Sequence, residues 1–180
     1  EMVRQEMVDR FGNAAYNDGY VVYTTVDSKM QQAAHDALLK GLRTYDWRHG
    51  WRGPERRLAP RESETPEQTL ARWQEALRTM PVIAALPPGI VTAIDETGAT
   101  VLTQSGDNVR LAWEGDLNKV RKYRSVNQTA APVKSIGDLL SPVDLIRIRE
   151  AAEGWRLTQV PKAQSALVSL DPKHGAIRRS

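Results

Sequence analysis

The chain contains no cysteine and has no long apolar run among its 180 residues. Without a thiol there is no disulfide, no thiolate metal site and no cysteine nucleophile, so cysteine usage says nothing about redox compartment. No segment approaches the roughly 20 apolar residues that a membrane-spanning helix needs. No signal peptide precedes the first residues, which read as the middle of a helix. We therefore expect this chain to be a piece of a longer protein.

The sequence also lacks a large excess of either charge. The net charge is +3, with 25 basic against 22 acidic residues, which indicates a mixed surface and not a dedicated polyanion binder. The three histidines are scattered singly, and no phosphate-loop, dinucleotide or hydrolase motif occurs. The sequence therefore predicts no metal and no cofactor.

The segment Tyr20–Tyr45 organises the first part of the chain. Its β-branched and aromatic start, Tyr20–Val26, predicts a strand. Ser28 and Gln31 have the spacing of a capping box, so a helix should begin there. Apolar residues then recur with a helical period as far as Tyr45, which predicts an amphipathic helix whose apolar face is buried.

The two ends of the chain contain further predicted elements, which we expect to pack with the segment Tyr20–Tyr45 as a small platform of strand, helix and hairpin. Val3, Met7 and Phe11 precede Gly12, which predicts a short helix over residues 2–11 with a glycine cap. Near the end of the chain, we expect strands at 166–170 and from residue 176 on, joined by a tight turn at 171–175. This hairpin is the candidate cover for the long helix.

Residues 46–64 predict a long loop, because glycines, prolines and arginines occur there without periodicity. Order should return at Thr65, where a capping box with Gln68 and a proline at the first helical position predict a second helix. Its expected buried stripe consists of Leu70, Trp73, Leu77 and Met80.

From Pro81 onward the hydrophobic period changes from about 3.6 to 2. Strands are expected at 90–94, 99–104 and 108–112, then a short helical segment capped by Asp116, a turn at 136–140, and strands at 144–149 and 155–160. This order predicts a closed five-stranded OB-type barrel, with another small barrel or sandwich as the alternative.

The predicted fold class is thus α+β, with an OB-type barrel inserted into a small platform of strand, helix and hairpin. The predicted domains are residues 1–80 for the N-terminal helical linker and platform, 81–161 for the barrel, and 162–180 for the returning hairpin. An inserted domain needs its two ends close together.

Two basic clusters are candidates for binding. The set at Lys119, Arg121, Lys122 and Arg124 is more typical of a solvated face than of a phosphate track. The denser cluster interleaves arginine with tryptophan, as protein interfaces often do, although a loop packed on its own domain is an equal alternative. Its members, our predicted partner-binding residues, are Trp47, Arg48, Trp51, Arg52, Arg56, Arg57 and Arg61.

Three stretches resemble a known family. They are EMVRQEMVDRFG at the start, YVVYTTVDSKMQQAAHDALLKGLRTYDWRHGWRGPE from Tyr20 to Glu55, and QSALVSLDPKHGAI near the end. Together they resemble the central region of class A bifunctional penicillin-binding proteins of the 1A type, over nearly the whole chain. The pattern D-x-R-x-G-x-R-G-P, at Asp46–Pro54, and the barrel point to the 1A subgroup.

The resemblance implies an OB-fold docking domain placed between a peptidoglycan glycosyltransferase and a D,D-transpeptidase. The catalytic motifs of the family do not carry over. No serine here has a lysine three residues on, and K-T-G does not occur. Ser125-Val126-Asn127 matches S-x-N only formally. We therefore expect no catalytic residues in this chain.

The function implied is that of a noncatalytic regulatory and docking domain in cell-wall synthesis. Its implied partners are an outer-membrane lipoprotein activator, the rest of the parent synthase and peptidoglycan, with no nucleic acid and no direct membrane insertion. The implied location is the periplasmic side of the inner membrane, with the parent anchored by an N-terminal transmembrane helix. The alternative is an OB module that binds glycan or a polyanionic polymer through the Arg48–Arg61 loop. A third hypothesis is that nothing binds and the chain only completes the enzyme core.

Overall fold

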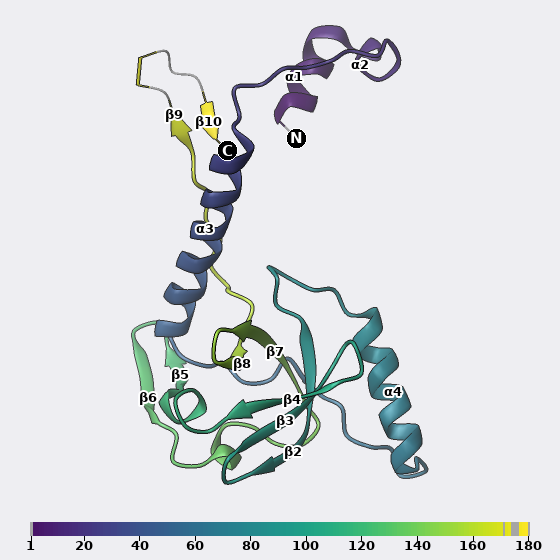
Figure 1. The fold of residues 1–180 in the computed structure, drawn as a ribbon, viewed down its shortest axis with the longest axis vertical. Coiled ribbons are helices and arrows are strands. Elements are labelled where there is room, and N and C mark those ends of the chain that lie inside the picture. Colours follow the sequence, from purple (N-terminus) through teal and green to yellow (C-terminus); the bar gives the residue numbers. More distant parts are fainter. Residues whose placement is uncertain (1, 171, 174–176, 180) are drawn as a thin grey trace. The chain divides into compact units, whose positions relative to one another are not determined.

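The computed structural model describes residues 2–170, 172–173 and 177–179 (Figure 1). The helices are α1 (Met2–Phe11), α2 (Ala14–Asn17), α3 (Ser28–Arg48) and α4 (Pro66–Thr79), with 3-10 turns η1 (Leu117–Lys119) and η2 (Ile136–Asp138). The strands are β1 (Arg56–Arg57), β2 (Pro88–Asp95), β3 (Gly98–Thr103), β4 (Asn108–Ala112), β5 (Arg121–Ser125), β6 (Gln128–Pro132), β7 (Asp144–Ala151), β8 (Gly154–Thr158), β9 (Ser169–Leu170) and β10 (Ile177–Arg179).

The chain forms two compact units. One comprises Glu1–His35 with Ala166–Ser180, and the other comprises Asp36–Ser165; we call the latter the barrel unit. The residues just before the barrel belong to it by packing, because β1 pairs with β7 and α4 contacts β2 and β3. The domain boundaries expected from the sequence, 1–80, 81–161 and 162–180, stay a prediction about the longer protein.

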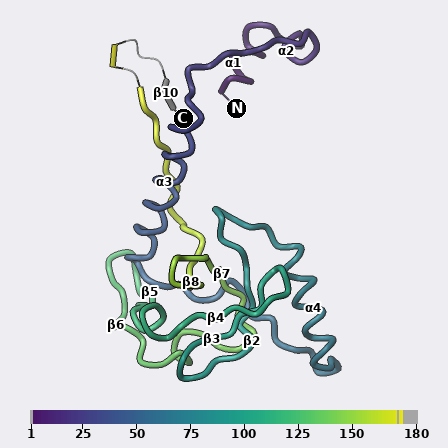
Figure 2. Tube along the Cα trace, in the orientation of Figure 1, coloured from purple at the N-terminus to yellow at the C-terminus, as the bar shows by residue number. Residues whose placement is uncertain are grey.

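Five strands close into a barrel, as the sequence predicts. The order is β7-β2-β3-β4-β8, and β7 pairs antiparallel with both β2 and β8, which closes the ring. β4 and β8 run parallel, with Leu111 opposite Trp155. β1 adds a short sixth strand beside β7. The tube in Figure 2 follows the chain through β2 to β4, then through β5 and β6, and back to β7 and β8.

Neighbouring residues on the barrel strands face two different cores. Val91, Val101 and Ile146 belong to the large cluster that fills the barrel, whereas their neighbours Ile90, Leu102 and Leu145 pack with Leu77 of α4 on the outer side. Successive side chains of a strand point to opposite faces, so these strands are apolar on both. All of these side chains are buried.

Helix α4 begins at the predicted capping box. Thr65 Oγ1 accepts from Gln68 N, and Gln68 Oε1 accepts from Thr65 N. The expected buried stripe is only partly correct. Leu77 is fully buried and Trp73 is half-buried, but Leu70 is 41% exposed, and Thr69 is buried in its place.

The segment between β4 and β7 differs from the expectation. Asp116 does not cap a helix, because its carboxylate accepts from Arg156 Nη1 and Leu157 N on β8 instead. Only the 3-10 turn η1 follows it. The sequence did not predict the β5–β6 hairpin, which is mostly exposed and lacks the alternating pattern of a half-buried strand.

The other unit contains the predicted first helix, α1, whose end is marked by Gly12 with φ +56°. The predicted strand at Tyr20–Val26 is wrong: these residues form neither helix nor strand, and all are exposed. Met30 and Tyr45, expected on a buried face of α3, are 47% and 54% exposed.

The start of α3 and the closing hairpin complete this comparison. Asp27, and not Ser28, caps α3, since its Oδ1 accepts from Lys29 N and Met30 N at 3.0 and 2.9 Å. The predicted hairpin is present as β9 and β10, with Leu170 opposite Ile177. The turn expected at 171–175 lies largely outside the described residues.

Candidate docking site at the roots of the barrel

One buried carboxylate joins the segment that enters the barrel to the segment that leaves it. Asp46, near the end of α3, is 5% exposed. Its Oδ1 accepts from Arg52 Nη1 at 2.7 Å and from Lys162 N at 3.2 Å, and its Oδ2 accepts from Gln159 Nε2 at 2.8 Å. We call Asp46, Arg52, Gln159 and Lys162 the root clamp.

Further hydrogen bonds run directly between the two segments. Arg52 Nη2 donates to Val160 O at 2.6 Å, and Arg52 N donates to Gln159 Oε1 at 3.0 Å. Gln159 Nε2 also donates to Gly50 O at 3.0 Å. Hydrogen bonds to charged groups are among the stronger polar contacts. Here they join the segment that enters the barrel to the segment that leaves it, and so hold the two in one arrangement.

Gly50 allows the chain to pass close to the β5 strand. Its φ is +94°, and an added Cβ would lie 2.8–2.9 Å from backbone atoms of residues 121–123. The next residue, Trp51, bonds to this backbone on both sides, donating to Arg121 O and accepting from Tyr123 N. The Trp51 side chain, 3% exposed, then enters the barrel core. Glycine is required here both by φ and by space.

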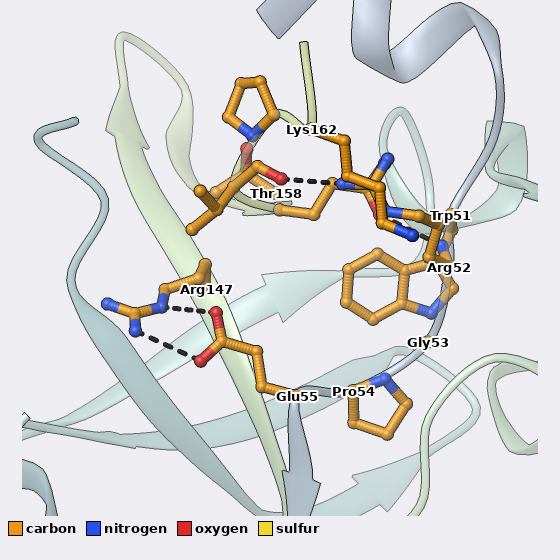
Figure 3. Close-up of a pocket in the computed structure, with 11 residues that line it drawn as sticks. Trp51, Arg52, Gly53, Pro54, Glu55, Arg147, Thr158 and Lys162 are labelled. Atoms are coloured by element: carbon orange, nitrogen blue, oxygen red, sulfur yellow. Dashed lines mark hydrogen bonds and ion pairs between the residues drawn. The ribbon is translucent and has the colours of Figure 1, made fainter. Parts of the chain in front are cut away.

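A pocket of about 360 Å³ lies at these roots, lined by residues 51–55, 158–162 and Arg147 (Figure 3). Arg147 on β7 is 2% exposed. Its guanidinium meets Glu55 in a two-pronged ion pair, at 2.8 and 3.1 Å, and also donates to Pro81 O and Leu86 O. This buried cation therefore ties the incoming segment to the barrel wall and is already satisfied by the protein.

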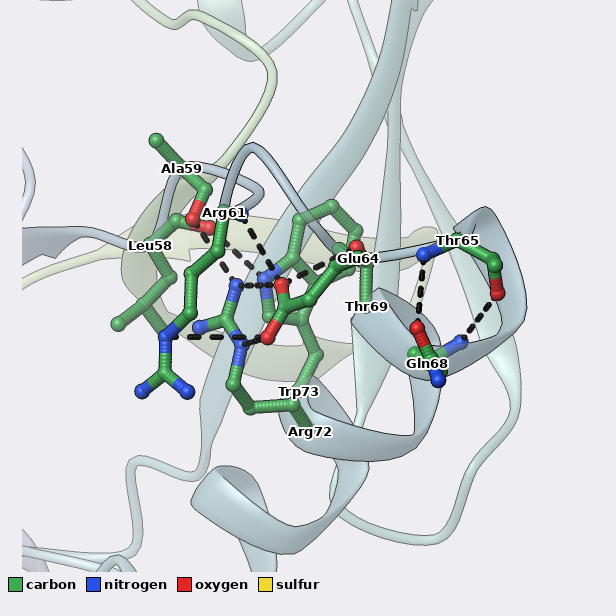
Figure 4. Close-up of polar contacts among 9 residues, drawn as sticks. All are labelled: Leu58, Ala59, Arg61, Glu64, Thr65, Gln68, Thr69, Arg72 and Trp73. Carbon is green, nitrogen blue, oxygen red and sulfur yellow. Dashed lines mark hydrogen bonds and ion pairs between the residues drawn. The ribbon is translucent and has the colours of Figure 1, made fainter.

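A further polar cluster fixes the loop between β1 and α4 (Figure 4). Glu64 accepts from Arg72 Nε at 2.8 Å and Nη2 at 2.9 Å, and from Arg61 N at 3.1 Å. The hydrogen bonds from Arg72 and then from the Arg61 backbone lower the pKa of Glu64 from its ordinary 4.5 to about 2. Trp73 Nε1 donates to Leu58 O beside this cluster.

Comparison with known proteins identifies the barrel. The family of the penicillin-binding protein OB-like domain matches residues 51–163. Penicillin-binding protein 1A of Pseudomonas aeruginosa is 41% identical over 179 residues, which are 99% of this chain and 21% of that protein. Its counterpart in Escherichia coli strain K12 is 39% identical, over 98% of this chain and 20% of that protein. The chain belongs to the penicillin-binding protein 1A family.

A solved structure supports the same assignment. The crystal structure of penicillin-binding protein 1A from Haemophilus influenzae matches with a TM-score of 0.72 and 37% identity, covering 99% of this chain and 24% of that one. The chain spans about a fifth of the length of the curated relatives it matches. The resemblance seen in the sequence is thereby confirmed, and the barrel is the OB-like domain of this family.

The seven predicted partner-binding residues do not share one environment in this OB-like domain. Trp51 is buried in the core, Trp47 packs against it, and Arg52 belongs to the root clamp. The other four are exposed. Arg57 and Arg61 contact Asp144 and Glu64, at 3.0 and 3.8 Å, and Arg48 and Arg56 have no ion pair within the described part of the chain.

The predicted loop itself is also more ordered than expected. Its first three residues, Asp46 to Arg48, continue α3, and Arg56–Arg57 form β1 against Leu145 and Asp144. The packed-loop alternative therefore describes its first half. The docking role of the exposed arginines stays a prediction.

Asp95 is a structural carboxylate at the β2–β3 turn. It accepts from Arg110 and from Thr97, and these hydrogen bonds hold the pKa of Asp95 well below its usual range. A carboxylate so stabilised in its charged form is a poor general acid. Among residues 2–170, 172–173 and 177–179, no three His, Asp or Glu side chains gather as metal ligands would. In the same residues no helix is long and apolar enough to cross a membrane.

Sequence reasoning missed the residues that build the roots. Asp46 and Gln159 lie 113 positions apart, and Glu55 and Arg147 lie 92 apart. No local pattern marks these pairs. The one usable signal was the motif at Asp46–Pro54, which contains both Asp46 and Arg52 of the clamp.

Proposed function

We propose that this chain is the noncatalytic docking and regulatory part of a bifunctional peptidoglycan synthase, and that its partner is an outer-membrane lipoprotein activator. Membership of the penicillin-binding protein 1A family supports a place in a cell-wall synthase. The sequence has neither S-x-x-K nor K-T-G, so acyl transfer would belong to other parts of the synthase. We place the synthase on the periplasmic side of the inner membrane, where both membranes are within reach.

The observation that carries the regulatory part of this proposal is the root clamp. A partner can only alter an active site elsewhere if its binding favours one of two arrangements of the intervening structure. Asp46 belongs to α3, and Gln159 and Lys162 belong to the outgoing segment. A displacement of the barrel by a bound partner would therefore act on both connections together.

A binding titration tests the docking role. The chain is titrated by calorimetry with the soluble part of the outer-membrane lipoprotein from the same organism, and saturable binding at micromolar concentration is expected. The variant Arg78→Gln, which removes one exposed charge from α4, serves as the control and should bind the lipoprotein as tightly as the unaltered chain. Absence of heat and of co-migration at high micromolar concentration would overturn the proposal.

The regulatory role needs the complete synthase. Asp46→Asn in that protein should leave lipoprotein binding intact but reduce the stimulation of transpeptidation by the lipoprotein. Equal stimulation of both proteins, at equal folding by circular dichroism, would remove the clamp from the mechanism while leaving docking in place.

The exposed arginines favour one second candidate, binding of glycan or a polyanionic polymer through Arg48, Arg56, Arg57 and Arg61. Salt separates the two candidates. Polymer binding should weaken steeply with salt, because many bound counterions are released, whereas docking of a folded partner that forms only a few ion pairs should weaken much less. If neither ligand binds, the chain serves only to complete the enzyme core.

A further inference from the structure

A second pocket, of about 600 Å³, lies within the barrel unit between the C-terminal half of α3 and the barrel wall. We call it the basic pocket. Its α3 residues recur at i, i+3, i+4, i+7 and i+8, so they occupy one helix face. That face carries three cations, Lys40, Arg43 and Arg48, around the half-buried Trp47. The barrel adds Arg149 from β7 and the side chain of Asp116.

The cations that line this pocket have no ion-pair partner among the described residues. Within the described residues no carboxylate forms an ion pair with Lys40, Arg43, Arg48 or Arg149. Asp116 is the only acidic residue in the lining, and its two oxygens are already engaged by Arg156 and Leu157 N, each at 3.2 Å. The pocket therefore presents an excess of cations to whatever enters it.

Part of this excess of cations lies in the β7–β8 ladder, where it destabilises the fold. Arg149 lies directly opposite Arg156, and like charges in that position destabilise a sheet. Arg156 is neutralised by Asp116 and by Glu153, the latter at 2.7 Å, but Arg149 is not. Local arrangements that oppose stability are expected where a protein binds something.

The lining also indicates the kind of anion. Trp47 and Leu157 provide an apolar wall beside the guanidinium groups, and Thr44 and Thr158 add hydroxyls. Arginine binds a carboxylate through two parallel hydrogen bonds, while the wall can cover the methylene groups of an acidic side chain. An inorganic phosphate has no methylene groups to cover this wall, so the apolar part of the lining favours an acidic side chain.

We propose that the basic pocket binds an acidic peptide segment, rich in Asp or Glu, supplied by the protein that docks on this domain. The inference rests on the proposed docking function and specifies the face that the partner meets. Arg43 and Arg149 are the two cations that approach the ligand from opposite walls, one from α3 and one from β7.

The test uses a fluorescein-labelled hexaglutamate peptide and the 180-residue chain, with fluorescence anisotropy as the readout. Saturable binding is expected, and the matching hexaglutamine peptide should not bind. The double variant Arg43→Gln/Arg149→Gln should weaken binding by about tenfold or more, because it removes two charge-assisted contacts. The control Arg78→Gln/Arg124→Gln makes the same change of net charge at two exposed residues outside the pocket and should stay within about twofold.

The outcomes distinguish this inference from the docking function. Equal weakening in both double variants would mean attraction to the net charge alone and would overturn the pocket. Stronger binding of inorganic tripolyphosphate, lost in the pocket variant only, would overturn the peptide in favour of a phosphate ligand. If the lipoprotein binds both double variants equally and the peptide binds neither, docking stands and the pocket fails. Circular dichroism of each variant excludes a loss of fold.

Discussion

The two compact units of this chain differ sharply in what they bury. Among the described residues, every large, fully buried side chain, from Leu77 to Ile148, lies in the barrel unit, Asp36–Ser165. In the unit formed by Glu1–His35 and Ala166–Ser180, the only buried apolar residue among those described is Ala34, and Tyr23 is 93% exposed. The barrel unit thus has its own core, whereas the described part of the other unit exposes an apolar segment, Tyr20–Val26, that has the composition of a strand.

This difference in buried apolar surface indicates that most of the stability of the chain comes from the barrel unit. Burial of apolar surface is the main favourable term in folding, so the barrel unit should fold by its own interactions. The exposed segment Tyr20–Val26 has the composition of a strand, and a strand is stable only when it is paired. All five tryptophans lie in the barrel unit, at positions 47, 51, 73, 113 and 155, so their fluorescence reports that unit alone.

The largest effect is expected at the root clamp. Asp46→Ala leaves Arg52 and Gln159 without their buried acceptor and should lower the free energy of unfolding of the barrel unit by about 3 kcal/mol. Urea unfolding followed by tryptophan fluorescence measures it. Glu62→Ala, an exposed carboxylate on the nearby loop, is the control and should have little effect. A loss as small as the control's would mean that the clamp does not stabilise the barrel.

Gly50→Ala should have the next largest effect, a loss of about 2 kcal/mol, because it combines a positive φ with a close approach to β5. Gly115→Ala provides a matched comparison. Its φ is +81°, but nothing lies within 4 Å of the added Cβ, so it has the backbone strain without the clash. Equal losses in the two variants, measured by the same unfolding curves, would contradict the close packing at Gly50.

The Glu64 cluster should make the barrel unit sensitive to acid. Because the pKa of Glu64 is lowered to about 2 in the folded chain, its contribution is complete above its ordinary pKa of 4.5 and is lost as pH falls towards 2. Glu64→Gln should therefore flatten the fall in unfolding free energy between pH 5 and pH 2.5. Glu62→Gln is the control. An unchanged pH slope in Glu64→Gln would show that the Arg72 contact is weak in solution.

The smallest effect should come from removing most of the other unit. A chain of residues 27–165, which keeps the Asp27 cap of α3, should unfold at nearly the same urea midpoint as the complete chain when tryptophan fluorescence is followed. A large drop in the urea midpoint would contradict the claim that the barrel unit folds by its own interactions, because it would show that the flanking unit supports the barrel core.

How much of this could be predicted depends on how local the cause is. The capping box at Thr65 and Gln68 and the positions of strands β2 to β4 are marked by a few consecutive residues, and both were predicted correctly. Closure of the barrel followed from the order of the strands. The β5–β6 hairpin was missed because its residues are largely exposed on both faces and therefore show no periodic pattern.

The errors arose where distant partners compete with local ones. Asp116 has the position of a helix cap, but Arg156 and Leu157 N bind its carboxylate more effectively from β8. Tyr20–Val26 has the composition of a strand but stays exposed and is not part of any sheet among the described residues. The root clamp could not be foreseen, because no rule of spacing connects Asp46 with Gln159. The site is thus the part of the molecule least visible in the sequence.

The closeness of the two roots has a consequence for how such a domain can be gained or lost. Arg52 Nη2 donates to Val160 O at 2.6 Å, so the polypeptide that departs into the barrel returns to within the length of one arginine side chain of its starting point. A host loop that accepts the whole barrel is stretched no further than one that accepts a tight turn, and its ends need no rearrangement. The barrel therefore has the geometry of an inserted domain, because a short turn would be enough to join the two segments if it were removed.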